Sequence, residues 1–131
     1  MVIAEEQIGG LTLLQSPEEF QLTRDALALV EFAGVKKGDR VCDLGCGVGN
    51  LLIPLGARAQ ELTLDGVELR ESAAALCRES LSRSGLTGTI VTGDLRARHE
   101  ALAWGSYDLV VANPPYFRSG SGKTSPAAGR A

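Results

Sequence analysis

The sequence is poor in the residues that build disulfide frameworks and zinc sites. It has three cysteines, Cys42, Cys46 and Cys77, and a single histidine, His99. No two of the cysteines have C-x-x-C spacing, so neither a set of disulfides nor a zinc site is predicted. This usage is typical of a protein that works in the reducing cytoplasm without a bound metal.

Long apolar runs and an excess of basic residues are also absent. No apolar stretch is long enough to span a bilayer, and the first residues lack the basic region and apolar core of a signal peptide. Neither a membrane nor secretion is therefore expected. The net charge is -3 and the pI about 5.1, which argues against a chain that holds nucleic acid by bulk charge alone. A local basic patch stays possible.

What the sequence does contain is a repeated alternation of short apolar strands and helices. With 131 residues, 44% of them hydrophobic, the chain is one domain or part of one. The predicted strands are residues 40–44, 62–67, 89–92 and 107–112, and the predicted helices after the glycine cluster are residues 70–84 and 95–103. Alternating elements with short links predict an α/β fold, a doubly wound and mostly parallel sheet.

The region before residue 37 has a different pattern. Two apolar pieces around Gly9-Gly10 predict a small hairpin within residues 1–15. Ser16-Pro17-Glu18-Glu19 has the form of a capped helix start, and the helical spacing that follows ends at Gly34. We therefore expect an amino-terminal hairpin and helix over residues 1–36 and a core over 37–118. The stretch 119–131, rich in Gly, Ser, Ala and Pro, is predicted to be flexible.

A glycine-rich turn follows the first strand of the predicted core. Its sequence, DLGCGVGN over residues 43–50, lets backbone approach a ligand closely at the start of a helix. The spacing is G-x-G-x-G, unlike the G-x-G-x-x-G of dinucleotide folds, and a tight turn of small residues explains it equally well. GSGKT at residues 120–124 does not complete a P-loop, because no strand leads into it and no helix follows.

Acidic residues end the next two predicted strands. Glu68 stands where such folds hold a carboxylate that accepts both ribose hydroxyls, and Asp94 follows Gly93 on the same edge of the sheet. Asp94 could accept from an adenine amine or cap the next helix. A strand-end acid can also be simply solvated. A glycine turn and a strand-end acid in register nevertheless describe an adenosine pocket.

The order of these motifs resembles a known enzyme family. DLGCGVGN, GVEL, TGDL and YDLVVANPPYF are similar to the motif series of class I S-adenosylmethionine-dependent methyltransferases, which have a Rossmann-like sheet. Asn-Pro-Pro-Tyr resembles the branch that methylates amines conjugated to a ring or a carbonyl. The flanking segments FQLTRDALALVEFA and GSGKTSP are similar to the tRNA (adenine-N6)-methyltransferases acting on a valine tRNA. The resemblance covers essentially the whole chain.

The resemblance implies a cofactor, S-adenosyl-L-methionine, and a set of residues that bind it. The implied cofactor-binding residues are Asp43, Gly45, Cys46, Gly47, Glu68, Leu69, Asp94, Leu95 and Asn113. Of the three cysteines, Cys42 and Cys77 are expected in the core and Cys46 in a more exposed position, where its backbone could contact the cofactor. His99 is expected at the surface.

Asn113-Pro114-Pro115-Tyr116-Phe117 would carry the chemistry. An adenine amine is a weak nucleophile because its lone pair is delocalised into the ring. If the Asn113 side-chain oxygen and the Pro114 carbonyl each accept one N–H, the lone pair is turned toward the methyl group, and two prolines keep that carbonyl in place. Tyr116 would stack on the base and Phe117 would form a second wall. Asn113, Pro114 and Tyr116 are the predicted catalytic residues.

The favoured interpretation is adenine-N6 methylation of RNA in the cytoplasm, with tRNA as the favoured RNA substrate. Glutamine-N5 methylation of a protein such as a release factor uses the same mechanism and remains open. A non-catalytic module that binds S-adenosylmethionine is the third interpretation, and intact Asn113 and Tyr116 argue against it. The family's sheet continues beyond a fourth strand. We therefore expect this chain to be truncated there, with its catalysis in doubt and its fourth strand open to self-association.

Overall fold

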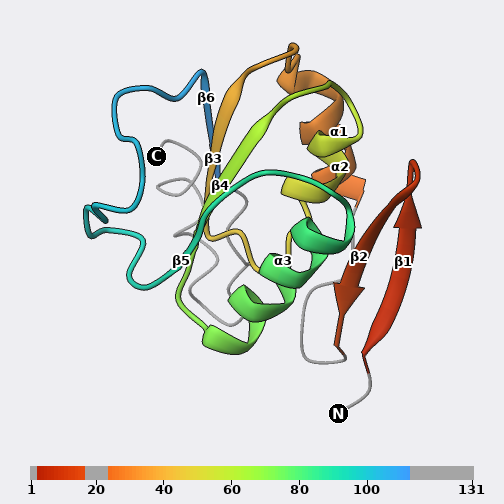
Figure 1. Cartoon of the computed structure of the whole chain (residues 1–131), viewed down its shortest axis with the longest axis horizontal. Coiled ribbons are helices and arrows are strands. Elements are labelled where there is room, and N and C mark those ends of the chain that lie inside the picture. Colours follow the sequence, from red (N-terminus) through yellow and green to blue (C-terminus); the bar gives the residue numbers. More distant parts are fainter. Residues whose placement is uncertain (1–2, 17–23, 113–131) are drawn as a thin grey trace, which may run out of the picture.

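The structure is a computed structural model that describes residues 3–16 and 24–112 (Figure 1). The elements in chain order are β1 (Ala4–Ile8), β2 (Leu11–Gln15), α1 (Arg24–Ala33), β3 (Arg40–Leu44), α2 (Leu52–Gly56), β4 (Thr63–Glu68), α3 (Glu71–Arg83), β5 (Ile90–Thr92) and β6 (Leu109–Ala112). These bounds confirm the predicted hairpin and the predicted strands to within a few residues.

Four parallel strands form the central sheet in the order β5-β4-β3-β6. The chain adds strands outward from β3 to β5 and then returns to place β6 on the other side of β3. This reversal confirms the expected doubly wound, Rossmann-like arrangement. It creates a switch point between β3 and β6, where Leu44 pairs with Ala112. Ligands of such sheets bind outside the carboxyl ends of the strands at that point.

The two faces of the sheet are covered differently. Helices α1, α2 and α3 lie on one side in Figure 1, and their apolar residues pack with Val41 of β3 and Leu64 of β4 in the larger core cluster. On the other side, a smaller cluster joins Cys42 and Val67 to Leu102 in the long connection between β5 and β6. That connection is part of the core as well as a link between two strands.

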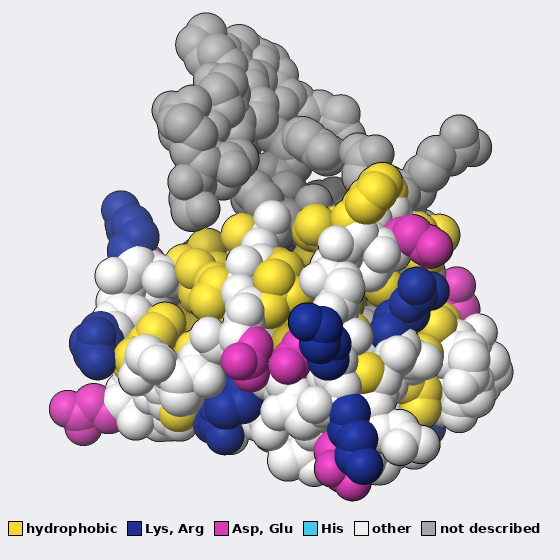
Figure 2. All heavy atoms as spheres, turned by 90° about the horizontal axis from the view of Figure 1, so that it is seen from above, with side chains coloured by type: hydrophobic (Ala, Val, Ile, Leu, Met, Phe, Trp, Pro, Cys, Tyr) yellow, Lys and Arg dark blue, Asp and Glu magenta, His cyan; other side chains and the backbone are white. Residues whose placement is uncertain are grey.

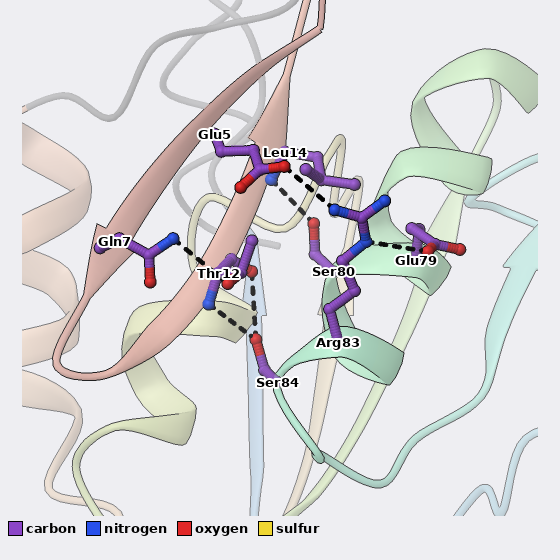
Figure 3. A network of polar contacts seen from close by, with 8 residues as sticks. All are labelled: Glu5, Gln7, Thr12, Leu14, Glu79, Ser80, Arg83 and Ser84. Atoms are coloured by element: carbon purple, nitrogen blue, oxygen red, sulfur yellow. Dashed lines mark hydrogen bonds and ion pairs between the residues drawn. The ribbon is translucent and has the colours of Figure 1, made fainter.

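The amino-terminal hairpin turns at two glycines with positive φ and packs against α3. Figure 3 shows how the free side of β2 is satisfied: the Ser80 hydroxyl accepts the Leu14 N–H and the Ser84 hydroxyl accepts the Thr12 N–H, both at 2.9 Å. The Ser84 hydroxyl also donates to the Thr12 carbonyl at 3.1 Å. Backbone groups that would otherwise be left without partners are bonded to α3, which fixes the hairpin on the helix.

One predicted element is wrong. Residues 95–103 form turns and no helix. The Asp94 side chain accepts the Arg96 N–H at 2.8 Å and the Asp94 carbonyl accepts the Ala97 N–H at 3.1 Å, so one capped turn forms after Asp94 but does not continue into a helix. The carbonyl of His99 accepts the Trp104 indole N–H and the Leu102 N–H, so it is not available to a helical ladder. The predicted helix therefore stops after its first turn.

Some expectations fall on residues that the structure does not describe. The capped helix start at residues 16–19 falls largely in the undescribed range 17–23, and the Asn-Pro-Pro-Tyr elbow and the tail fall in 113–131. The described part of α1 begins at Arg24, and Gly34 follows its last residue with φ of 66°, as predicted. Within residues 3–16 and 24–112, no helix is both long and apolar enough to cross a membrane.

Candidate functional site

The glycine turn begins directly after β3 and is bonded to the neighbouring strand. Gly45 and Gly47 have φ of 85° and 59°, values that residues with a side chain adopt only with strain. The N–H groups of Gly45 and Cys46 both donate to the Val67 carbonyl, at 2.7 and 3.0 Å. A Cβ on Gly47 would meet no atom within 4 Å, so open space lies beside this backbone. The turn is therefore held by its hydrogen bonds to β4, and its backbone is accessible at Gly47.

Glu68 joins this turn to the end of β4. Its Oε1 accepts the Gly47 N–H at 2.8 Å, and its Oε2 accepts the backbone N–H and the Nε–H of Arg70, both at 3.0 Å. The Glu68 side chain is 8% exposed and that of Arg70 is 47% exposed. The carboxylate is thus held in one orientation at the carboxyl edge, and three of its roughly four acceptor positions are used, which leaves one on Oε1 for a further hydroxyl group.

Asp43, the last buried residue before the turn, has an unsatisfied acceptor. It is 1% exposed, and its Oδ1 has no hydrogen-bond partner in the structure. Burial, and then the charge of Glu68, raise the pKa of Asp43 to about 8. An unpaired buried carboxyl either keeps a proton or pairs with a cationic group. This fits a ligand that brings positive charge, as S-adenosylmethionine does.

Cys46 does not have the exposure that the sequence suggested. It is 3% exposed, because its side chain turns under the sheet edge and packs on Gly66, where a Cβ would lie 2.8 Å from the Cys46 sulfur. The hydrogen bond with Cys77, and then burial, raise the pKa of the Cys46 thiol. Cys46 is therefore a core residue whose backbone alone faces the turn, and it is no nucleophile.

Asp94 and two leucines complete this edge. The Gly93 N–H donates to the Glu68 carbonyl at 2.9 Å, which keeps the Asp94 segment beside the end of β4. Leu69 is 67% exposed, and the Cδ1 of Leu95 lies 3.6 Å from the position of a Cβ on Gly45. Two leucines beside two acids at adjoining strand ends offer apolar surface to a flat ring and acceptors to its polar groups.

Hydrogen bonds from Arg96 hold the pKa of Asp94 at about 2. The Arg96 side chain is 90% exposed, so a ligand can displace it at little cost. Asp94 is therefore an ionised acceptor at neutral pH.

The structure thus brings together all the predicted cofactor residues that it describes. Asn113, Pro114, Tyr116 and Phe117 lie outside the described residues. Asn113 follows Ala112 in sequence, and Ala112 pairs with Leu44, the residue before the glycine turn.

Two residues near this edge were missed by sequence reasoning. Arg70 holds Glu68, and the His99 ring is bonded to the Asp94 segment. The role of Arg70 could have been predicted, because a basic residue two positions after a strand-end acid can pair with it. Nothing in the sequence indicates the contact of His99.

Charges of both signs alternate on the described surface. Figure 2 shows Lys and Arg side chains next to Asp and Glu on the face seen there. Some ion pairs lie within one helix, as Arg78–Glu71 does in α3, and others join separate segments, as Arg58–Glu31 does. In the described part of the chain, no group of three or more His, Cys, Asp or Glu side chains is placed to hold a metal ion. The face seen in Figure 2 is therefore not uniformly positive, in keeping with the net charge of -3.

Known proteins with similar sequences are methyltransferases of several kinds. The 4-amino-L-phenylalanine/4-methylamino-L-phenylalanine methyltransferase of Streptomyces pristinaespiralis is 36% identical over 113 residues, 84% of this chain and 37% of that protein. The tRNA1(Val) (adenine(37)-N6)-methyltransferase of Cronobacter sakazakii is 35% identical over 106 residues, 79% of this chain and 43% of that protein. The chain thus spans less than half the length of these relatives.

A solved structure with the same fold carries a cofactor. The T. thermophilus 16S rRNA N2 methyltransferase, in complex with AdoMet and guanosine, superposes with a TM-score of 0.67 at 26% identity. The similarity covers 92% of this chain and 34% of that one. The sequence also matches the family described as "Methyltransferase small domain" over residues 22–130. Since that match takes in most of the chain, the chain belongs to the methyltransferase small domain family.

Proposed function

We propose that this chain is the cofactor-binding part of an S-adenosyl-L-methionine-dependent methyltransferase that modifies the exocyclic N6 amine of adenine in RNA, with tRNA as the favoured substrate. One observation carries the proposal: the glycine turn, Glu68 and Asp94 meet at the carboxyl edge. Beside this edge, the chain enters Asn-Pro-Pro-Tyr from Ala112, which pairs with Leu44.

Each described residue of the edge has a role that fits its surroundings. The Glu68 carboxylate, oriented by Gly47 and Arg70, accepts one ribose hydroxyl at the remaining position on Oε1 and the other at Oε2, in place of the half-exposed Arg70 guanidinium. Asp43, which keeps its proton at neutral pH in the free protein, releases it when a cationic cofactor binds and so provides a buried negative charge beside that cofactor. Gly45, Cys46 and Gly47 contribute backbone at the turn, and the space beside Gly47 is open. S-adenosyl-L-methionine supplies a methyl group on a sulfonium when it is bound.

The adenine end of the pocket uses the next strand end. Asp94 is an ionised acceptor and can receive the adenine amine of the cofactor once Arg96 moves aside. Leu69 and Leu95 provide apolar surface on which a ring can rest. The two leucines are exposed in the absence of a ligand, and covering them contributes to affinity.

The amine of the substrate is activated by residues 113–117. The Asn113 side chain and the Pro114 carbonyl each accept one N–H of the amine, which directs its lone pair outward. Tyr116 and Phe117 hold the ring, by stacking and by apolar contact. This chemistry needs an amine conjugated to a ring or a carbonyl and does not by itself choose RNA.

A small aromatic amine is the second candidate substrate. The observation that favours it is the 36% identity to an enzyme named for 4-amino-L-phenylalanine, whose amine is also attached to a ring. Glutamine in a protein remains the third candidate, since its amide nitrogen is conjugated to a carbonyl.

The experiment compares methyl acceptors in parallel. The chain is incubated with labelled S-adenosylmethionine and, separately, with unmodified tRNA, DNA, a release factor and 4-amino-L-phenylalanine, and the product is identified by mass. The full-length Cronobacter sakazakii relative serves as the positive control for tRNA. Label in N6-methyladenosine supports the proposal. Label on the amino acid or on glutamine refutes the RNA substrate, and loss of activity in Asn113→Ala tests the activation step.

A further inference from the structure

His99 lies against the segment that carries Asp94. Its Nε2 is 2.8 Å from the Asp94 carbonyl oxygen, and since a carbonyl only accepts, Nε2 carries the hydrogen. A Cβ on Gly93 would lie 2.6 Å from the Cε1 of His99, so the ring rests directly on the backbone at the end of β5. Only a glycine at position 93 leaves room for this contact.

The backbone of His99 is anchored from its other side. The Trp104 indole N–H donates to the His99 carbonyl at 2.7 Å. Trp104 packs in the smaller core cluster with Leu102 and Tyr107, and its ring meets that of Tyr107 edge-on at 6.1 Å. A series of contacts through Trp104 and His99 therefore connects the smaller core cluster to Asp94.

This support matters because the Asp94 segment has no regular structure. Residues 93–108 contain no helix or strand, and Asp94 is exposed. The Gly93 N–H bond to the Glu68 carbonyl fixes one end of the segment, and the bond to His99 fixes the next residue. Arg96 orients the Asp94 side chain locally but is itself 90% exposed, so it cannot fix the segment relative to Glu68.

We propose that His99, anchored by Trp104, is a positioning residue that holds Asp94 at the distance from Glu68 that an adenine nucleoside requires. This rests on the proposed function, in which Asp94 receives the adenine amine. A carboxylate that is fixed in place discriminates against hypoxanthine, which presents a carbonyl oxygen where adenine presents an amine. A carboxylate on a loose loop moves away from that oxygen and loses the discrimination.

The test measures base selectivity and affinity together. Calorimetry gives the dissociation constants of S-adenosylhomocysteine and of S-inosylhomocysteine for the full chain and for three variants. His99→Ala removes the donor, and His99→Gln keeps an N–H near the position of Nε2. Glu100→Ala, an exposed neighbour, is the matched control. Thermal melting of each variant shows whether it is folded.

We expect the wild-type chain and Glu100→Ala to prefer the adenine ligand by about tenfold or more. His99→Ala should lose most of this preference while it still binds, and His99→Gln should regain most of it. A folded His99→Ala chain with the wild-type preference overturns the inference, as does a folded His99→Gln chain that behaves like His99→Ala. If the wild-type chain binds both ligands equally, the role of Asp94 fails and the inference with it. If it binds neither, the proposed function itself fails.

Discussion

Replacing Asp43 with asparagine tests whether its buried carboxyl controls the pH dependence of stability. Asp43 is fully buried, one of its oxygens has no partner, and its pKa is raised to about 8 from an ordinary value of 3.8. The folded protein therefore keeps this proton at neutral pH, whereas the unfolded chain has already released it. Because the folded state binds more protons between these two values, the contribution of Asp43 to stability is lost as the pH rises through that window.

The size of the loss in stability follows from the pH range between the unfolded and the folded pKa of Asp43. Each pH unit inside it lowers the free energy of unfolding by up to about 1.4 kcal/mol. From about pH 5 to about pH 8, the wild-type chain should lose on the order of 4 kcal/mol relative to Asp43→Asn, which has no proton to release. Asparagine has nearly the same shape, so the two chains should differ little below about pH 4, where Asp43 is protonated in both the folded and the unfolded state.

Urea unfolding at a series of pH values measures this difference directly. Glu100→Gln, which changes an exposed carboxylate, is the control and should follow the wild-type curve. Glu68→Gln should shift the pH window downward, because the charge of Glu68 is the second cause of the raised pKa. Parallel curves for the wild-type chain and Asp43→Asn would refute the reasoning, since they would mean that the buried carboxyl binds no extra proton.

Three further results are expected. Glu68→Ala should weaken S-adenosylhomocysteine binding by about 1–3 kcal/mol in calorimetry, because the ribose hydroxyls and the Gly47 N–H lose their acceptor; unchanged affinity would contradict the ribose role. Asn113→Ala should leave that affinity nearly intact but lower methyl transfer by about 10²–10³, whereas Tyr116→Ala should weaken substrate capture by about 1–3 kcal/mol and Tyr116→Phe should be mild. Among the described residues, β6 pairs with β3 alone and the Val110 side chain of β6 is 51% exposed. Sedimentation should therefore show concentration-dependent self-association of the chain, which Val110→Lys should reduce. A monomer at all concentrations would show that this strand is covered.

Local pattern in the sequence was enough to place most elements and most of the candidate site. The strand over Arg40–Leu44 was predicted with its observed bounds, and α3 within one residue at each end, because short apolar runs and helical spacing express local preferences. The positions of Glu68 and Asp94 also followed from sequence. Parallel strands end at one edge of the sheet, so residues that end neighbouring strands meet there.

Tertiary contacts decided the rest. The connection from β5 to β6 was predicted as a helix, yet only one turn forms after Asp94, and the His99 carbonyl accepts the Trp104 indole N–H. Cys46 sits in a loop by sequence but is buried, because Gly66 on another strand leaves space for its sulfur. Asp43 has no partner for Oδ1, a fact that no local pattern encodes.

Local patterns in the sequence predict where most strands and helices begin and which residues stand at the strand ends. Which of those residues are buried, which are bonded and which lack a partner depends on tertiary contacts. The reason is that apolar periodicity acts between residues a few positions apart, whereas burial and polar satisfaction depend on segments far apart in the chain, such as Gly47 with Glu68 and Asp94 with His99.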